Sequence, residues 1–93
     1  MSTFLLEDQI LTWRLTGELT LTTVPSLLSE LAKQTLFPQV VDLGEVTHSD
    51  SAGVALLIEL IRQARDRTLT FHHVPAQILS IATVCGVQAF FTP

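Results

Sequence analysis

A short aliphatic strand runs almost directly into a strongly apolar helix near the middle of this chain. The strand is expected at residues 40–43, where two adjacent valines indicate burial on both faces of a sheet. The helix is expected at residues 51–67, and only a small, mostly polar stretch, GEVTHSD, separates the two. A strand that leads through a helix to another strand of the same sheet needs a right-handed crossover. The junction therefore predicts an α/β fold with parallel strands.

The flanking segments continue this alternation of strands and helices. Residues 10–16 alternate between apolar and polar side chains, with Trp13 on the apolar face, as is typical of a half-buried strand. Residues 4–7 are expected to form a hairpin with them, and a further strand is expected at residues 69–73. The expected order is β-β-α-β-α-β-α. This is an α/β fold with a mixed sheet, helices packed against it, and a single domain over residues 1–93.

The other two helices have recognisable ends. The first is expected to begin at Thr20 or Thr22 and to end near Leu36, because Pro38 bars its continuation. The last is expected at residues 74–85, followed by a glycine that can act as a left-handed cap.

Two expectations concern the end of the chain. Cys85 is the single cysteine, so an internal disulfide is excluded, and its aliphatic neighbours predict a buried, inert thiol. Residues 87–91 fit either a short final strand or a packed tail.

Composition limits the partners of this chain of 93 residues. Its net charge is −4, with five Lys and Arg in total. A nucleic-acid surface needs clustered basic residues, so nucleic acid is not an expected partner.

Only 15% of residues are charged, against about a quarter in typical soluble domains. The longest apolar run, residues 54–58, is far shorter than the roughly 18 residues that span a bilayer, and no secretory signal is visible. The apolar excess belongs either to the core or to a surface that a partner covers.

The polar stretch lies at the amino end of the apolar helix, where backbone N–H groups carry partial positive charge. Asp50 or Ser49 is expected to cap this helix. Ser51 then takes the first helical position with its hydroxyl outward, and Ala52 and Gly53 let another molecule approach closely. Capping alone is the simplest interpretation. A phosphate on Ser51, or an acidic group of a partner, suits the same amides.

The helix itself is expected to have two apolar faces. One stripe is spaced to face the sheet: Val54, Leu57, Ile58, Ile61 and Ala64. Leu56 is expected on the outer face with Ala52 and Glu59, which suggests a docking surface, although a single exposed leucine is common.

The segment VVDLGEVTHSDSAGVALLIELIRQA resembles the signature of the STAS family, the sulphate-transporter and anti-sigma-factor-antagonist domains. Asp42 and Leu43 match the end of the family's strand, and Asp50, Ser51 and Gly53 match the motif that opens its helix. LTGELTL and VPAQILSIATVCGV are also similar to the family, so the resemblance covers nearly the whole chain. It implies the STAS fold and a role in binding other proteins.

The resemblance leaves two branches of the family open. The MlaB type is a stand-alone subunit that binds the cytoplasmic ATPase of a bacterial phospholipid-transport ABC complex, which maintains outer-membrane lipid asymmetry. Ala52 favours this branch, because a second serine is frequent there in phosphorylated antagonists. In the other branch, an anti-sigma-factor antagonist, Ser51 is the phosphoacceptor. A third interpretation is a module that associates with itself.

The MlaB-type branch implies a cytoplasmic location, peripheral to the inner membrane through the ATPase and without direct membrane insertion. The implied partner-binding residues are Thr47, His48, Ser49, Asp50, Ser51, Ala52, Leu56 and Glu59.

No catalytic or metal site is expected. Ser51 is not in a Gly-x-Ser-x-Gly elbow, and His48 lies on the same loop, poorly placed as a base. His72 and His73 are strand neighbours that point to opposite faces, so they cannot hold one metal ion together. A protein that is not an enzyme, without metal or cofactor, is predicted.

Overall fold

The computed structural model describes residues 3–7, 10–34, 37–65 and 67–91, and no described helix is long and apolar enough to cross a membrane. The described elements confirm the expected order, with a short 3₁₀ helix added at the end. They are β1 (Thr3–Glu7), β2 (Ile10–Leu19), α1 (Val24–Ala32), β3 (Val40–Ser49), α2 (Ser51–Ala64), β4 (Thr70–His72), α3 (Ala76–Val84) and η1 (Gln88–Phe90).

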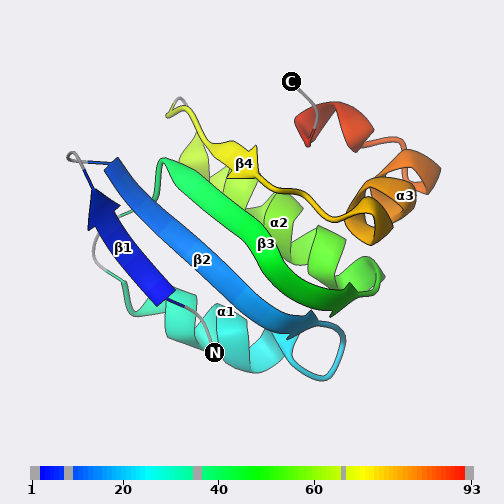
Figure 1. Cartoon of the computed structure of the whole chain (residues 1–93), viewed down its shortest axis with the longest axis horizontal. Coiled ribbons are helices and arrows are strands. Elements are labelled where there is room, and N and C mark those ends of the chain that lie inside the picture. The colour runs from blue at the N-terminus through cyan, green and yellow to red at the C-terminus, as the bar shows by residue number, and fades with distance from the viewer. Residues whose placement is uncertain (1–2, 8–9, 35–36, 66, 92–93) are drawn as a thin grey trace.

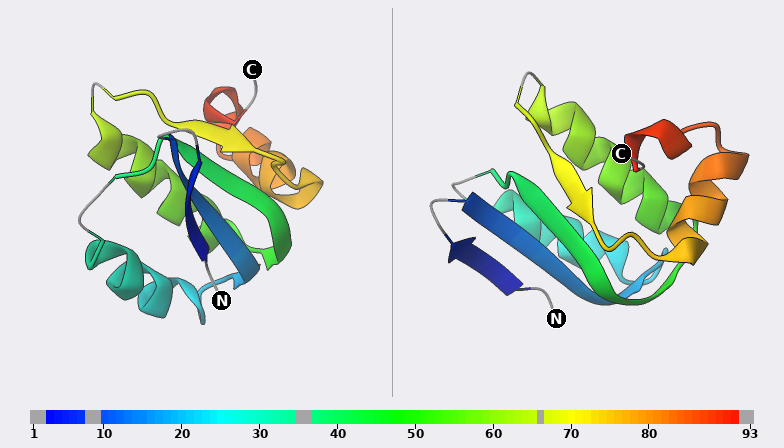
Figure 2. Two further views of the ribbon diagram at one scale, coloured as in Figure 1. Left: turned by 60° about the vertical axis from the view of Figure 1, so that its left-hand side comes forward. Right: turned by 45° about the horizontal axis from the view of Figure 1, so that its top comes forward.

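The four strands form one mixed sheet in the order β1-β2-β3-β4. β1 is antiparallel to β2, whereas β2, β3 and β4 are parallel, as the strand–helix alternation predicts. Figure 1 shows α1 and α2 behind the sheet, and α3 beside α2 beyond the end of β4. The views in Figure 2 agree with this arrangement. α2 therefore lies between α1 and α3.

The core lies between the sheet and these helices. Trp13 and Leu15 of β2, and Val41 and Leu43 of β3, are buried, so Trp13 is confirmed as a core residue. Val40 is only half-buried, and the expectation that β3 is buried on both faces is wrong. The reason is that α1 and α2 lie on the same face of the sheet (Figure 1).

β3 is longer than its side-chain pattern predicts. It extends to Ser49 rather than ending at Leu43, so most of the polar stretch is strand. β2 also extends beyond Gly17, whose φ of 80° accompanies a register shift, and its last residues still pair with β3 as far as Leu19 opposite Ser49. Backbone pairing continues here whatever the polarity of the side chains, because every residue brings a donor and an acceptor.

Both interior helices are shorter than expected. α1 begins after Thr23 rather than Thr20 or Thr22, and it ends at Ala32 rather than near Leu36. Thr20 serves the preceding turn instead, where its carbonyl accepts the N–H groups of Thr23 and Val24. α2 ends at Ala64, because the next residue leaves helical geometry with a φ of 55°.

The end of the chain is a packed tail, one of the two alternatives. Gly86 has a φ of 76° and follows α3 as the left-handed cap. Phe91 is buried, and its ring centroid lies 5.0 Å from that of Phe71 on β4. Cys85 is exposed, which contradicts the expected burial. Ile78 and Ala82 occupy the buried face of α3, and Cys85 follows the helix at its rim.

Candidate protein-docking surface

Asp50 caps α2 and ties it to a neighbouring turn. Its Oδ1 accepts the N–H of Ala52 at 2.9 Å, which decides between the two expected caps. Its Oδ2 accepts the N–H of Leu21, in the turn between β2 and α1, at 3.0 Å. The hydrogen bond from Leu21, together with those from Ala52 and Gly53, holds the pKa of Asp50 below its ordinary value. The carboxylate thus fixes two chain segments at the amino end of α2.

Ser51 opens α2 and is exposed. Its position at the first turn of a helix places it beside backbone N–H groups that have no intrahelical partner. Ala55, one turn further on, is also exposed, and Ala52 between them is half-buried. The amino half of α2 therefore presents a low surface of small side chains.

The turn held by Asp50 adds an apolar side chain that the sequence analysis missed. Leu21 is 76% exposed, one of four large apolar side chains that stand out in the described part of the chain. The signal in the sequence is its place between Thr20 and Thr22, in a turn where polar residues are usual. We assign Leu21 and Ser51 to one surface, because Asp50 joins the turn that carries Leu21 to the start of α2.

Ser49 and Gly53 lie behind this surface rather than on it. Ser49 is 2% exposed, and its hydroxyl donates to the carbonyl of Asp50 at 3.1 Å. Its N–H donates to Oε1 of Gln77 on α3 at 2.9 Å, which joins the end of β3 to α3. A Cβ on Gly53 would lie 2.5 Å from the carbonyl oxygen of Leu19 and would also strike Ser49 Oγ. Gly53 permits close packing inside the chain. The expectation that Gly53 lets another molecule approach closely is therefore wrong.

Leu56 is not on the surface. It is 2% exposed and belongs to the core, which contradicts its expected place in a docking face. α2 is covered on its flanks by α1 and α3 as well as by the sheet (Figure 1), so its buried arc is wider than one stripe. Ile58 and Ile61, expected on the buried stripe, are only half-buried.

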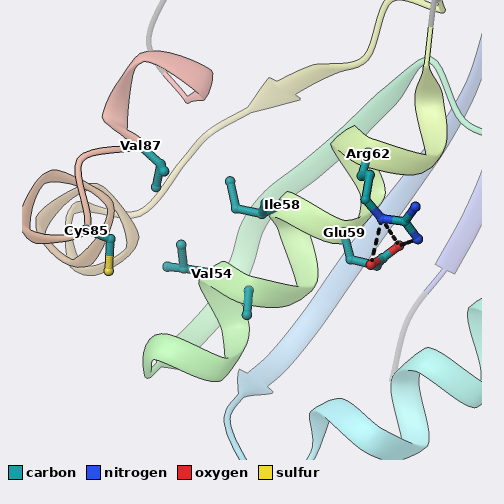
Figure 3. Close-up of a pocket in the computed structure, with 7 residues that line it drawn as sticks. Val54, Ile58, Glu59, Arg62, Cys85 and Val87 are labelled. Atoms are coloured by element: carbon teal, nitrogen blue, oxygen red, sulfur yellow. Dashed lines mark hydrogen bonds and ion pairs between the residues drawn. The ribbon is translucent and has the colours of Figure 1, made fainter.

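The remaining predicted residues are accessible. Thr47 and His48 are exposed on the last part of β3, and His48 pairs in register with Glu18 of β2. Glu59 is half-buried further along α2. The two oxygens of its carboxylate share the N–H of Arg62 Nε, at 3.1 and 3.0 Å, and hydrogen bonding to Arg62 lowers the pKa of Glu59 (Figure 3).

One of the two neighbouring histidines, His73, contacts an acidic side chain of β3. Nδ1 of His73 lies 3.1 Å from Oδ1 of Asp42, and the same oxygen accepts the N–H of Gly44. Among the residues that the structure describes, no three His, Cys, Asp or Glu side chains gather as metal ligands would.

A mixed sheet with helices on one face and an exposed serine at the start of a central helix define a STAS-type domain, a class of protein-interaction modules that are generally non-catalytic. The family model described as "Mlab, STAS domain" matches residues 3–92, and the chain belongs to this family. No curated protein sequence matches the chain.

A solved structure shares the fold. It is described as the anti-sigma factor antagonist SpoIIAA in its unphosphorylated form, and it matches with a TM-score of 0.71 and 14% sequence identity. The match covers 99% of this chain and 86% of that chain. The chain is thus related in fold to the anti-sigma-factor antagonists.

Proposed function

We propose that this protein is a non-enzymatic STAS subunit that binds the cytoplasmic ATPase of a bacterial phospholipid-transport ABC complex and supports its assembly and activity. The complex would maintain outer-membrane lipid asymmetry. The protein would lie in the cytoplasm, peripheral to the inner membrane through the ATPase, and residues 1–93 would act as one domain. The family model's description as Mlab supports this choice of partner.

The observation that carries the proposal is the surface built around Asp50. One carboxylate holds exposed Leu21 beside exposed Ser51, at 3.0 Å from the Leu21 nitrogen. This hydrogen bond fixes the backbone that carries Leu21, so a partner that covers the side chain does not have to order the turn as well. The small side chains that follow Ser51 on α2 allow a partner's backbone to come close.

The proposed contact residues are those of the sequence prediction that remain accessible, with one addition. They are Leu21, Thr47, His48, Asp50, Ser51, Ala52 and Glu59. Ser49 and Leu56 would support this surface from beneath and would not touch the ATPase, because both are buried.

A pair of leucines tests the proposal. The protein is expressed together with the ATPase subunit of the same transport system, and the purified partners are titrated by calorimetry. Leu21→Ser should weaken binding by about tenfold or more, since about 1.4 kcal/mol corresponds to each factor of ten and a buried leucine contributes that much. Leu28→Ser is the control, because Leu28 is also exposed, on α1. Equal affinities for both variants, or no binding by the unmodified chain, would contradict the proposal.

A second candidate is an anti-sigma-factor antagonist switched by phosphorylation of Ser51. The exposure of Ser51 at the start of α2 favours it, because a helix amino end stabilises a phosphate. Incubation with an anti-sigma-factor kinase and ATP, followed by mass spectrometry, separates the candidates. Phosphate on Ser51, with no affinity for the transport ATPase, would favour the switch. A stable oligomer that ignores both partners would instead favour self-association.

A further inference from the structure

A pocket lies between the end of β2 and α1, which follows β2 through the turn that carries Leu21 (Figure 1). Its volume is about 280 Å³, whereas pockets that take a whole small molecule have roughly 300–1,000 Å³. The pocket is therefore of a size to take one side chain of another protein. The lining residues that matter here come from the strand end and from α1: Gly17, Glu18, Thr23, Ser26, Leu27 and Glu30.

Hydrogen bonds within the chain hold the pocket open in one shape. The hydroxyl of Thr23 donates to the carbonyl of Glu18 at 2.7 Å and accepts the N–H of Thr20 at 2.9 Å. Gly17 has a φ of 80°, and the register shift between it and Glu18 marks an irregularity of the kind that redirects the next side chain of a strand. The strand end and the start of α1 are thus fixed relative to each other.

Both charged side chains that line the pocket are acidic. Glu18 and Glu30 are exposed, and neither carboxylate takes part in an ion pair or a hydrogen bond within the part of the chain that the structure describes. Residues 15–32, which supply the whole lining, contain no Lys, Arg or His. The same pocket has the apolar side chain of Leu27 in its wall. The group that complements it is a cation on an apolar stem.

The pocket adjoins the surface around Asp50. Leu21 lies in the turn that the hydrogen bond from Thr23 to Glu18 closes, and Asp50 holds the N–H of Leu21 at 3.0 Å. A partner that covers Leu21 therefore also faces the mouth of the pocket.

We propose that this pocket receives one arginine side chain of the ATPase subunit. The aliphatic stem lies against Leu27, and the guanidinium donates hydrogen bonds to the carboxylates of Glu18 and Glu30. Arginine suits the pocket better than lysine, because its planar group presents five N–H donors and is more easily stripped of water. The inference rests on the proposed function, to which it adds a specific charge contact.

Removing one carboxylate tests this contact. The purified ATPase subunit is titrated by calorimetry at low and at high salt. Glu30→Gln should weaken binding by about tenfold or more at low salt, and its affinity should depend less on salt, because the arginine loses a charged acceptor. Glu45→Gln is the matched control, because Glu45 is exposed on β3 and does not line the pocket. It should change the affinity less than about twofold, and equal losses for the two variants would contradict the inference.

A second pair of variants fills the pocket from within. Ser26→Arg places a guanidinium four residues before Glu30 on α1, where it pairs with that carboxylate and occupies the pocket. It should weaken ATPase binding by about tenfold or more. Ser29→Arg adds the same side chain to α1 outside the pocket and should change the affinity less than about twofold. Both serines are exposed, so both variants should keep the melting temperature of the unmodified protein.

A double-mutant cycle identifies the arginine. Each arginine of the ATPase subunit is replaced by alanine in turn, and each variant is titrated with the unmodified protein and with Glu30→Gln. One replacement should weaken binding to the unmodified protein by about tenfold and have a clearly smaller effect on Glu30→Gln. If every replacement changes both affinities by the same factor, no arginine pairs with Glu30 and the inference is wrong.

The outcomes separate the two proposals. If the ATPase binds and Ser51→Glu weakens it, but Glu30→Gln and Ser26→Arg bind normally, the pocket inference is wrong and the proposed function stands. If the ATPase does not bind the unmodified chain, the proposed function fails and the pocket inference fails with it.

Discussion

The backbone N–H of Leu21 donates to Oδ2 of Asp50, 29 residues further along the chain, at 3.0 Å. The other oxygen of the same carboxylate caps α2 through the N–H of Ala52. One side chain therefore both starts the central helix and positions the turn beside it. Removing it should affect stability and binding together.

Asp50→Ala is predicted to lower the melting temperature by several degrees, because the first turn of α2 loses its cap. It should also weaken ATPase binding, since the turn that carries Leu21 is no longer held. Asp50→Asn keeps one acceptor oxygen for the cap at Ala52 but turns a donor toward the N–H of Leu21, so its melting temperature should lie between those of Asp50→Ala and the unmodified protein. Differential scanning calorimetry measures both variants, and a melting temperature unchanged by Asp50→Ala would contradict the role given to the carboxylate.

Gly53→Ala is predicted to destabilise the fold by about 1–3 kcal/mol, the usual cost of overpacking. Its Cβ would meet the backbone carbonyl of Leu19, which cannot move without shifting β2. Gly86→Ala is a useful comparison, because nothing lies within 4 Å of that position and only its φ of 76° opposes a side chain. Its cost should be about 1–2 kcal/mol. Urea denaturation of both variants checks the two values, and a neutral Gly53→Ala would exclude the close packing described.

Leu56 and Leu21 should respond in opposite ways to truncation. Leu56→Ala is predicted to cost about 2–5 kcal/mol of folding stability, because Leu56 is buried in the core. Leu21→Ser should leave stability nearly unchanged and reduce binding. Measuring unfolding and ATPase affinity on both variants separates the core from the docking surface. If Leu56→Ala kept full folding stability but bound the ATPase more weakly, Leu56 would be a contact residue and not a core residue.

Acid should weaken the fold partly through Asp42. Burial raises the pKa of Asp42, but hydrogen bonds from Gly44 and His73, with Arg14 nearby, outweigh it and hold the pKa below 3.8. A carboxyl with a lowered folded pKa stabilises the fold fully above its unfolded pKa, and the contribution is lost as the pH falls through the folded value. Asp42→Asn should therefore reduce stability at pH 7 and flatten its decline below about pH 5. Urea midpoints measured at several pH values check this, and parallel curves for both proteins would contradict it.

The sequence predicts most of the fold, because local patterns specify it. The alternation around Trp13 gives β2, and Gly86 marks the end of α3. The length of β3 was missed, because its polar end is held by backbone pairing to β2 rather than by its own side chains. The position of Leu56 was missed because helical spacing gives a face but not which neighbouring helix covers it.

The candidate site, like the fold, is predicted only in part from the sequence. Asp50 and Ser51 follow from capping rules and from the family motif, and the structure places Asp50 as the cap and Ser51 at the surface. The two threonines beside Leu21 indicate an exposed turn, but no local pattern shows that this turn meets Asp50, 29 residues further along the chain. The sequence also places Ser49 among the contact residues. Its burial depends on packing against distant segments, such as the hydrogen bond from its N–H to Gln77, 28 residues away.

The most direct measurement is a calorimetric titration of the ATPase subunit with Ser51→Glu and with the unmodified protein. A glutamate at the first turn of α2 suits the helix dipole, so the fold should remain as stable as before. A charge buried without a partner in the interface should lower the affinity by about tenfold or more, and Ser80→Glu on α3 should not. An unchanged affinity for Ser51→Glu, with the unmodified protein binding normally, would show that the amino end of α2 is not the contact surface.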